Sequence, residues 1–224
     1  MYLRTDVFIA TFGDRAVALD LNTSRYFALG RSLAAAVRAM ADGAGSSGWI
    51  GRDDDLPSAL AALAARGLVC DGASPRQTSP IVMPDSTLWP PRGVTATDAT
   101  APGLMSVMVA LSEAQLYLVA LPLGRVVRRL RAAKASVPTH SSRRALPACL
   151  AQFARSRPWY PAKPICRLDA IALCLYLWRN GLAAELVFGV RLDPFGAHCW
   201  AQYDGAALND AHDFVGQFAP IMAV

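Results

Sequence analysis

Hydrophobic and polar positions alternate with a period of two near the start of the chain and then change to a helical period. Strands are predicted at residues 2–12, 16–20 and 25–29, with a turn at 21–24 before the third. Helices are predicted at 32–40 and 56–66, where Leu56, Leu60 and Leu63 share one face. Three strands followed by two helices predict a small winged-helix-like domain at residues 1–72.

The next segment, residues 73–101, is rich in Pro, Ser, Thr and Gly and has no lasting periodicity, so it is expected to be a linker or a wrapped loop. A long apolar helix follows at 103–121. Glu113 and Gln115 interrupt it, and a buried charge inside a bilayer is costly, so a core helix is expected instead of a membrane span. Further helices are predicted at 124–135 and 142–156.

Residues 163–213 carry the most informative pattern. Positions 169–178 are apolar on nearly every side, which predicts a buried helix, and Arg179-Asn180-Gly181 predicts its end. Pro164 disfavours helix at the residue before it, so Cys166 is placed at the N-terminus of this helix. Unpaired N–H groups and the helix dipole there favour a thiolate, which is the nucleophilic form of cysteine.

Two strands are predicted after this helix, at 184–192 and 197–203, and the Asp204-Gly205 turn leads into a short return at 206–210. Alternation places His198, Trp200 and Gln202 on one face of the second strand, so the neighbouring Cys199 points away from His198. The predicted architecture is α+β, with a buried helix packed on an antiparallel sheet at residues 102–224.

A cysteine that opens a buried helix, a histidine within A-H-C-W-A and an aspartate within L-N-D together resemble the transglutaminase-like cysteine peptidases. The match is nearest to the lasso-peptide leader peptidases, or B proteins, since the separations of 32 residues from Cys166 to His198 and 12 from His198 to Asp210 agree with that family. The resemblance implies a transglutaminase/papain-like domain with Cys166 as nucleophile, His198 as base and Asp210 as the orienter of the imidazole. Asp213 and His212 are nearby competitors for the third position.

The segment D-L-N-T-S-R-Y-F-A-L at 20–29 resembles the leader-binding module of ribosomal peptide biosynthesis, the RiPP recognition element. The resemblance implies that residues 1–72 bind a precursor leader as an added strand. The implied contacts come from the third strand and the second helix, although alternation must send some of them inward. They are Arg25, Tyr26, Phe27, Leu29, Leu60 and Leu63.

The oxyanion hole is expected to use the Cys166 backbone N–H, and Trp159 or Tyr160 is a candidate second donor or wall of the site. No C-x-x-C pair occurs, so no metal is expected, and no Gly-rich phosphate loop occurs, so no cofactor is expected. The family resemblance implies an ATP-dependent, asparagine-synthetase-like cyclase as a partner protein. Any ATP dependence would come through that partner.

The net charge of +5 is unevenly distributed, with eleven Lys and Arg and no Asp or Glu between residues 125 and 167. Aromatic residues are not interleaved with the cations at 125–134, so a solvated helix face or a protein docking surface is favoured over nucleic-acid binding. Five cysteines without paired spacing, and no secretory signal in the first twenty residues, predict the cytoplasm.

The two resemblances together imply a cysteine endopeptidase that binds the leader of a lasso-peptide precursor and cleaves it at the leader–core junction, freeing the core N-terminus for cyclisation. Two alternatives stay open. In an acyltransferase of the same fold, an amine instead of water would resolve the thioester. In a non-catalytic scaffold, the chain would only present precursor peptides to another enzyme.

Overall fold

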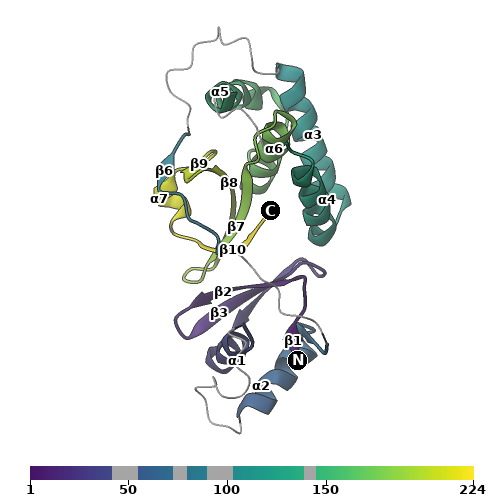
Figure 1. Ribbon diagram of the computed structural model, residues 1–224, viewed down its shortest axis with the longest axis vertical. Coiled ribbons are helices and arrows are strands. Elements are labelled where there is room, and N and C mark those ends of the chain that lie inside the picture. The colour runs from purple at the N-terminus through teal and green to yellow at the C-terminus, as the bar shows by residue number, and fades with distance from the viewer. Residues whose placement is uncertain (42–54, 73–79, 90–102, 139–144) are drawn as a thin grey trace. The chain divides into compact units, whose positions relative to one another are not determined.

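The computed structural model describes residues 1–41, 55–72, 80–89, 103–138 and 145–224 of this mixed α/β protein (Figure 1). The chain divides into two compact units, Met1–Pro80 and Ile81–Val224. The second unit includes residues 81–89, which belong to the segment whose composition predicts a linker. None of the helices in the described ranges is long and apolar enough to cross a membrane.

The first unit contains a three-stranded antiparallel sheet of β2 (Val7–Phe12), β3 (Arg15–Asp20) and β4 (Arg25–Leu29), with β3 in the centre. The strand predicted at 2–12 is divided in two by a turn at Thr5-Asp6. This turn lets β1 (Tyr2–Leu3) pair with β5 (Val69–Cys70) instead of extending β2.

The β3–β4 turn is closed by the carboxylate of Asp20. Its Oδ1 accepts the backbone N–H of Asn22 at 2.9 Å, and its Oδ2 accepts the hydroxyl of Thr23 at 3.0 Å. Arg4 donates to the same carboxylate at 2.7 Å, which compensates a charge that is only 1% exposed. The D-L-N-T-S segment therefore has a structural role, since it fixes the register of the hairpin.

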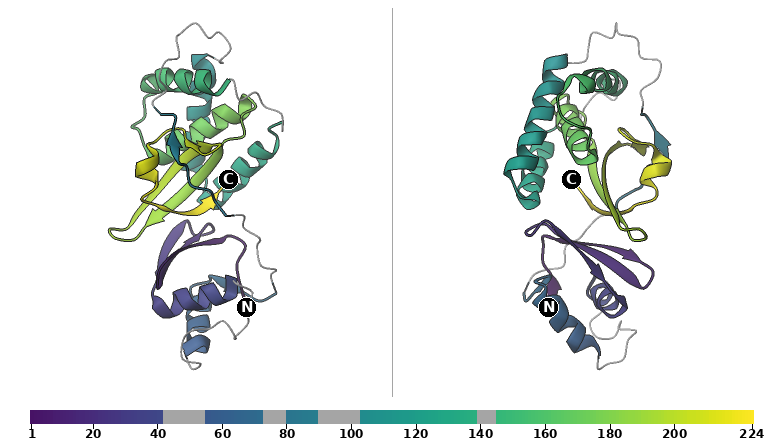
Figure 2. Two further views of the ribbon diagram at one scale, coloured as in Figure 1. Left: turned by 60° about the vertical axis from the view of Figure 1, so that its left-hand side comes forward. Right: turned by 180° about the vertical axis from the view of Figure 1, so that it is seen from behind.

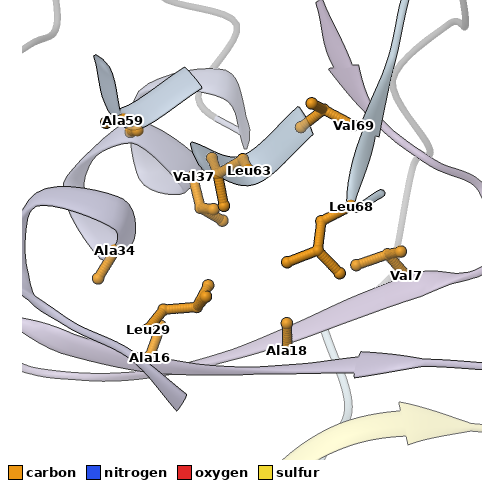
Figure 3. Packing of buried hydrophobic residues seen from close by; sticks show 11 residues of the cluster. Val7, Ala16, Ala18, Leu29, Ala34, Val37, Ala59, Leu63, Leu68 and Val69 are labelled. Carbon is orange, nitrogen blue, oxygen red and sulfur yellow. The ribbon is translucent and has the colours of Figure 1, made fainter. Parts of the chain in front are cut away.

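The core of the first unit lies between this sheet and helices α1 (Arg31–Ala41) and α2 (Asp55–Ala65). Leu29 from β4, Val37 from α1 and Leu63 from α2 converge there (Figure 3). Both predicted helices are present, and their buried residues fall on the sides that face the sheet and each other.

The second unit is built around α6 (Cys166–Arg179), in which every residue from Ala170 to Trp178 is buried. α3 (Leu104–Ala120), α4 (Leu123–Ala135) and α5 (Leu146–Ser156) lie around it, and β8 (Gly196–Tyr203) packs on its remaining side (Figures 1 and 2). Gly181 ends α6 at φ 73°, where the N–H of Leu182 bonds to the carbonyl of Leu177 at 2.9 Å. The predicted stop signal is therefore confirmed as a Schellman cap.

The sheet of the second unit has the order β10-β7-β8-β9-β6. β7 (Glu185–Arg191) and β8 (Gly196–Tyr203) match the two predicted strands. The predicted return at 206–210 is shorter, because β9 covers only Ala206–Ala207 and the chain then leaves the sheet. β6 (Ser86–Thr87) pairs in parallel with β9 at one edge.

The C-terminal residues form α7 (His212–Val215) and β10 (Ala219–Ala223), which pairs with β7. The sequence pattern predicts no element after residue 210, where the local signal is weak. The backbone bonds of β10 to β7 and the burial of Val215, Ile221 and Met222 override that weak local signal.

Candidate active site

Cys166 is the first residue of α6 and is preceded by the extended Ile165. Cys149, Cys174 and Cys199 are buried, whereas Cys70 and Cys166 are partly exposed. Burial raises the pKa of each of the three buried thiols. The pKa of Cys166 is instead lowered, because its hydrogen bond with His198 outweighs the burial that opposes ionisation. Cys166 is thus both partly exposed to solvent and more readily ionised than an ordinary thiol.

His198 lies on β8 with its ring between Cys166 and Asp210. Its Nε2 is 2.7 Å from Oδ2 of Asp210, so Nδ1 remains as the ring nitrogen for the hydrogen bond with the Cys166 thiol. Burial opposes a charged ring, but hydrogen bonds to Asp210 and Cys166 raise the pKa of His198 to about 9. A raised imidazole pKa next to a lowered thiol pKa favours a thiolate–imidazolium pair at neutral pH.

Asp210 follows the short β9, and its two oxygens have different partners. Oδ2 faces His198, while Oδ1 accepts the backbone N–H of Ala211 at 2.9 Å. The preceding Asn209 accepts the backbone N–H of Ala201 on β8 at 2.7 Å through its side chain. This bond ties the segment that carries Asp210 back to the strand that carries His198.

The competing residues Asp213 and His212 are engaged with each other instead. His212 Nε2 lies 3.0 Å from Oδ1 of Asp213, whose side chain is 88% exposed. His212 Nδ1 lies 2.9 Å from the hydroxyl of Thr87. The structure therefore brings Cys166, His198 and Asp210 together and directs Asp213 elsewhere.

Aromatic residues surround the His198 ring. Phe214 on α7 meets it edge-on with ring centroids 5.1 Å apart, and Phe218 lies at the same distance. Trp200 stacks with it at 6.2 Å, on the face that strand alternation predicts. The two phenylalanines come from the C-terminal segment, whose role was missed because nothing local in the sequence links them to His198.

Gly189 on β7 allows this aromatic group to pack. A Cβ at this position would lie 2.7 Å from Cζ3 of Trp200 and 2.9 Å from Cβ of Phe218. Gly189 is also paired with His198 across the β7–β8 ladder. The glycine therefore leaves the space in which the Trp200 ring supports the histidine.

The chain segment that leads to Cys166 begins with the 3-10 helix η3 (Arg157–Trp159), and Arg157 fixes it in place. Arg157 Nε donates to Oδ1 of Asp169 at 2.5 Å, and its Nη2 donates to the carbonyl of Ala162 at 3.1 Å. Burial raises the pKa of Asp169, and Arg157 opposes that shift. This pair joins the segment before Cys166 to the first turn of α6, and no local pattern in the sequence indicates it.

The candidate wall residues Trp159 and Tyr160 differ in their surroundings. Trp159 is 77% exposed, and Tyr160 donates from its hydroxyl to Gln115 on α3 at 2.5 Å and lies beside the Arg157 guanidinium. An oxyanion role for either residue stays a prediction. Within the described ranges, no group of three or more His, Cys, Asp or Glu is placed to hold a metal ion.

In the first unit, the candidate leader-binding residues divide by burial. Leu29 and Leu63 are 1% and 0% exposed and belong to the core, and Phe27 packs against that core. Their apolar side chains are used to hold the sheet on the helices, so they are not free to line a groove. Arg25 is exposed, and Tyr26 and Leu60 are half-buried.

The profile of the transglutaminase-like superfamily matches residues 108–223, which is slightly more than half of the chain. No curated protein and no solved structure matches the chain. The matched range contains Cys166, His198 and Asp210 and ends within β10, so it covers the helix and the strands that carry these three side chains.

Proposed function

The chain belongs to the transglutaminase-like superfamily, which includes cysteine peptidases and acyltransferases, and on this premise we propose that it is a cysteine endopeptidase. Its proposed substrate is a ribosomally made lasso-peptide precursor, cleaved at the leader–core junction. The observation that carries the proposal is the hydrogen-bonded series Cys166, His198 and Asp210, with its lowered thiol and raised imidazole pKa values.

In the proposed reaction, the Cys166 thiolate attacks the scissile carbonyl carbon and forms a tetrahedral oxyanion. The Cys166 backbone N–H, in the first turn of α6 where helix donors lack intrahelical partners, is a donor to that oxyanion. The His198 imidazolium then protonates the leaving amine as the C–N bond breaks, which releases the core peptide and leaves a thioester.

Hydrolysis of the thioester completes the cycle. Neutral His198 removes one proton from water, the hydroxide oxygen adds to the carbonyl carbon, and the C–S bond breaks to give the Cys166 thiolate and the leader carboxylic acid, which releases its remaining proton to solvent. The proton that His198 accepts restores the imidazolium. Asp210 keeps the ring in the orientation that serves both steps, because its carboxylate is bonded to Nε2.

The proposed substrate binding uses the first unit as a winged-helix-like leader-binding domain. Among the described residues, β4 pairs with β3 on one side, and no strand pairs along its other edge. A leader backbone added along that edge would make main-chain bonds, with Arg25 and Tyr26 as side-chain contacts. Holding the leader there would raise the effective concentration of the scissile bond at Cys166.

A cellular setting and a partner protein are proposed as well. The chain would act in the cytoplasm, and its product, a core peptide with a free N-terminal amine, would be joined to an acidic side chain by an ATP-dependent, asparagine-synthetase-like cyclase. The exposed arginines of α4, including Arg125 and Arg128, support a protein docking surface there. The peptidase itself would need no cofactor.

The decisive experiment incubates the purified full chain with a candidate precursor, with and without the cyclase, in water enriched in ¹⁸O. Peptidase activity would give a free core and a leader carrying one ¹⁸O in its new carboxylate, detected by mass spectrometry. Cys166→Ala should abolish both products, whereas Cys70→Ala, at the other partly exposed cysteine, should retain them. Intact precursor under every condition would refute the proposal.

The same reaction separates the alternatives. An acyltransferase would transfer the leader acyl group to an added primary amine, giving an amide without ¹⁸O. A non-catalytic scaffold would bind the leader but leave precursor processing in cells unchanged by Cys166→Ala.

A further inference from the structure

Residues 81–88, here called the strap, are built into the sheet next to the site although they precede the matched family range. β6 of the strap pairs in parallel with β9. Two further backbone hydrogen bonds extend this pairing. The N–H of Asp85 donates to the carbonyl of Gly205 at 3.0 Å, and the N–H of Leu88 donates to the carbonyl of Ala207 at 2.9 Å. The strap thus holds the strand from which the chain continues to Asp210.

Thr87 makes the strap's contact with α7. Its hydroxyl oxygen accepts the backbone N–H of His212 at 2.7 Å and lies 2.9 Å from Nδ1 of the same residue. His212 is two residues beyond Asp210 and begins the helix that carries Phe214. One hydroxyl therefore fixes the chain on the C-terminal side of Asp210 and the start of the helix that carries Phe214.

The first half of the strap contacts the support of the His198 ring. Ile81 and Met83 pack against the buried cluster that contains Trp200 and Phe218. Gln202, which is 5% exposed, donates to the carbonyl of Val82 at 2.8 Å and accepts the indole N–H of Trp200 at 3.0 Å. A short chain of contacts thus runs from the strap through Trp200 to His198.

We propose that the strap is a positioning element of the active site, with Thr87 as its principal positioning residue. It contributes no reacting group, but it fixes β9, α7 and the aromatic residues on which the distance from His198 to Asp210 depends. The inference rests on the proposed function in one respect, since it takes Cys166, His198 and Asp210 as the reacting groups. The functional unit accordingly begins near residue 81 and not at the start of the matched family range.

The test uses the full chain and iodoacetamide, which alkylates a thiolate and requires no knowledge of the substrate. The rate of alkylation at Cys166 is followed by peptide mass spectrometry from pH 5 to 10. Thr87→Val removes the hydroxyl with little change in shape, while Thr87→Ser keeps the hydroxyl. Ser86→Ala is the matched control, because Ser86 is exposed and its hydroxyl donates to the turn carbonyl of Gly205 at 3.2 Å and not to α7 among the described residues.

In the wild type, the rate of alkylation should rise at a pH below that expected for an ordinary thiol. Thr87→Val should move this rise to higher pH, and the rate on the acidic side should fall about tenfold for each pH unit of displacement. Thr87→Ser and Ser86→Ala should follow the wild type. A role limited to packing would instead affect Thr87→Ser at least as much as Thr87→Val.

The possible failures are distinguishable. A wild-type Cys166 that titrates as an ordinary thiol would refute the thiolate–imidazolium pair, the proposed function and the strap together. A lowered wild-type profile that Thr87→Val leaves unchanged would refute the strap alone. If circular dichroism shows that Thr87→Val is unfolded, Met83→Ala replaces it, because this change removes most of the side chain that packs against the Trp200 cluster. Met83→Ala should also move the rise in alkylation to higher pH, and an unchanged profile would refute the strap.

Discussion

Replacing Asp210 with asparagine tests the electrostatics of the site with almost no change in shape. The carboxylate oxygen is 2.7 Å from Nε2 of His198, and the two side chains are 26% and 11% exposed. The substitution keeps an oxygen acceptor for the ring but removes the negative charge that stabilises the imidazolium. Asp210→Asn should therefore lower the pKa of His198.

The structure gives the scale of the effect. A pKa of about 9, against the ordinary value of 6.5, corresponds to about 3 kcal/mol in favour of the charged ring at about 1.4 kcal/mol per unit. The hydrogen bond to the charged carboxylate of Asp210 is the largest of the effects that raise this pKa, and a neutral amide oxygen accepts a weaker bond, so Asp210→Asn should lower the pKa by about one unit, or about 1.4 kcal/mol.

The assay is an NMR titration of the imidazole signals, which is simple because the chain has three histidines. His212→Gln and His140→Gln variants assign the signals. Asp213→Asn is the matched control, since Asp213 pairs with His212 and should leave the His198 titration unchanged. An unchanged His198 pKa in Asp210→Asn would show that the carboxylate does not stabilise the imidazolium, and the assignment of Asp210 would then be wrong.

Three further predictions follow from packing and charge. The raised pKa of His198 contributes stability that is fully present below pH about 6.5 and lost as pH rises through about 9, whereas the lowered pKa of Cys166 contributes stability that is gained as pH rises towards the ordinary thiol value. Because these contributions oppose each other in the wild type, Cys166→Ala, which removes the thiol contribution, should show the steeper decrease in the free energy of unfolding measured in urea between pH about 6.5 and about 9; identical profiles in the two proteins would contradict the coupled shifts. Gly189→Ala should destabilise the second unit by about 1–3 kcal/mol, because the added Cβ meets Trp200 and Phe218. Gly30→Ala, whose Cβ meets open space, should change the urea midpoint little, and equal effects of the two variants would argue against a steric clash at Gly189. Asp20→Ala should destabilise the first unit by about 3 kcal/mol in the same assay, because it leaves Arg4 without its buried partner. Asp14→Ala, at an exposed ion pair, serves as the control, and equal stability of the two variants would refute a structural role for Asp20.

The local elements were predictable where the pattern was periodic and bounded by strong stop signals. The buried helix α6 follows from an apolar run that ends at Arg179-Asn180-Gly181, and β8 follows from an alternation that correctly places His198 and Trp200 on one face. The short strands β6 and β10 were not predicted. Their residues have little intrinsic preference, and their pairing depends on partners distant in the sequence.

The sequence by itself determined which chemical groups the site contains and on which kinds of element they lie, because a helix N-terminus and the face of a strand are local properties of the chain. The tertiary structure decided which carboxylate meets the imidazole, since Asp210 and Asp213 are three residues apart and only the positions of β9 and α7 separate their roles. It also decided which candidate peptide-binding residues are buried in the core, namely Leu29 and Leu63. Distances between side chains on different elements depend on long-range packing, which no local pattern in the sequence specifies.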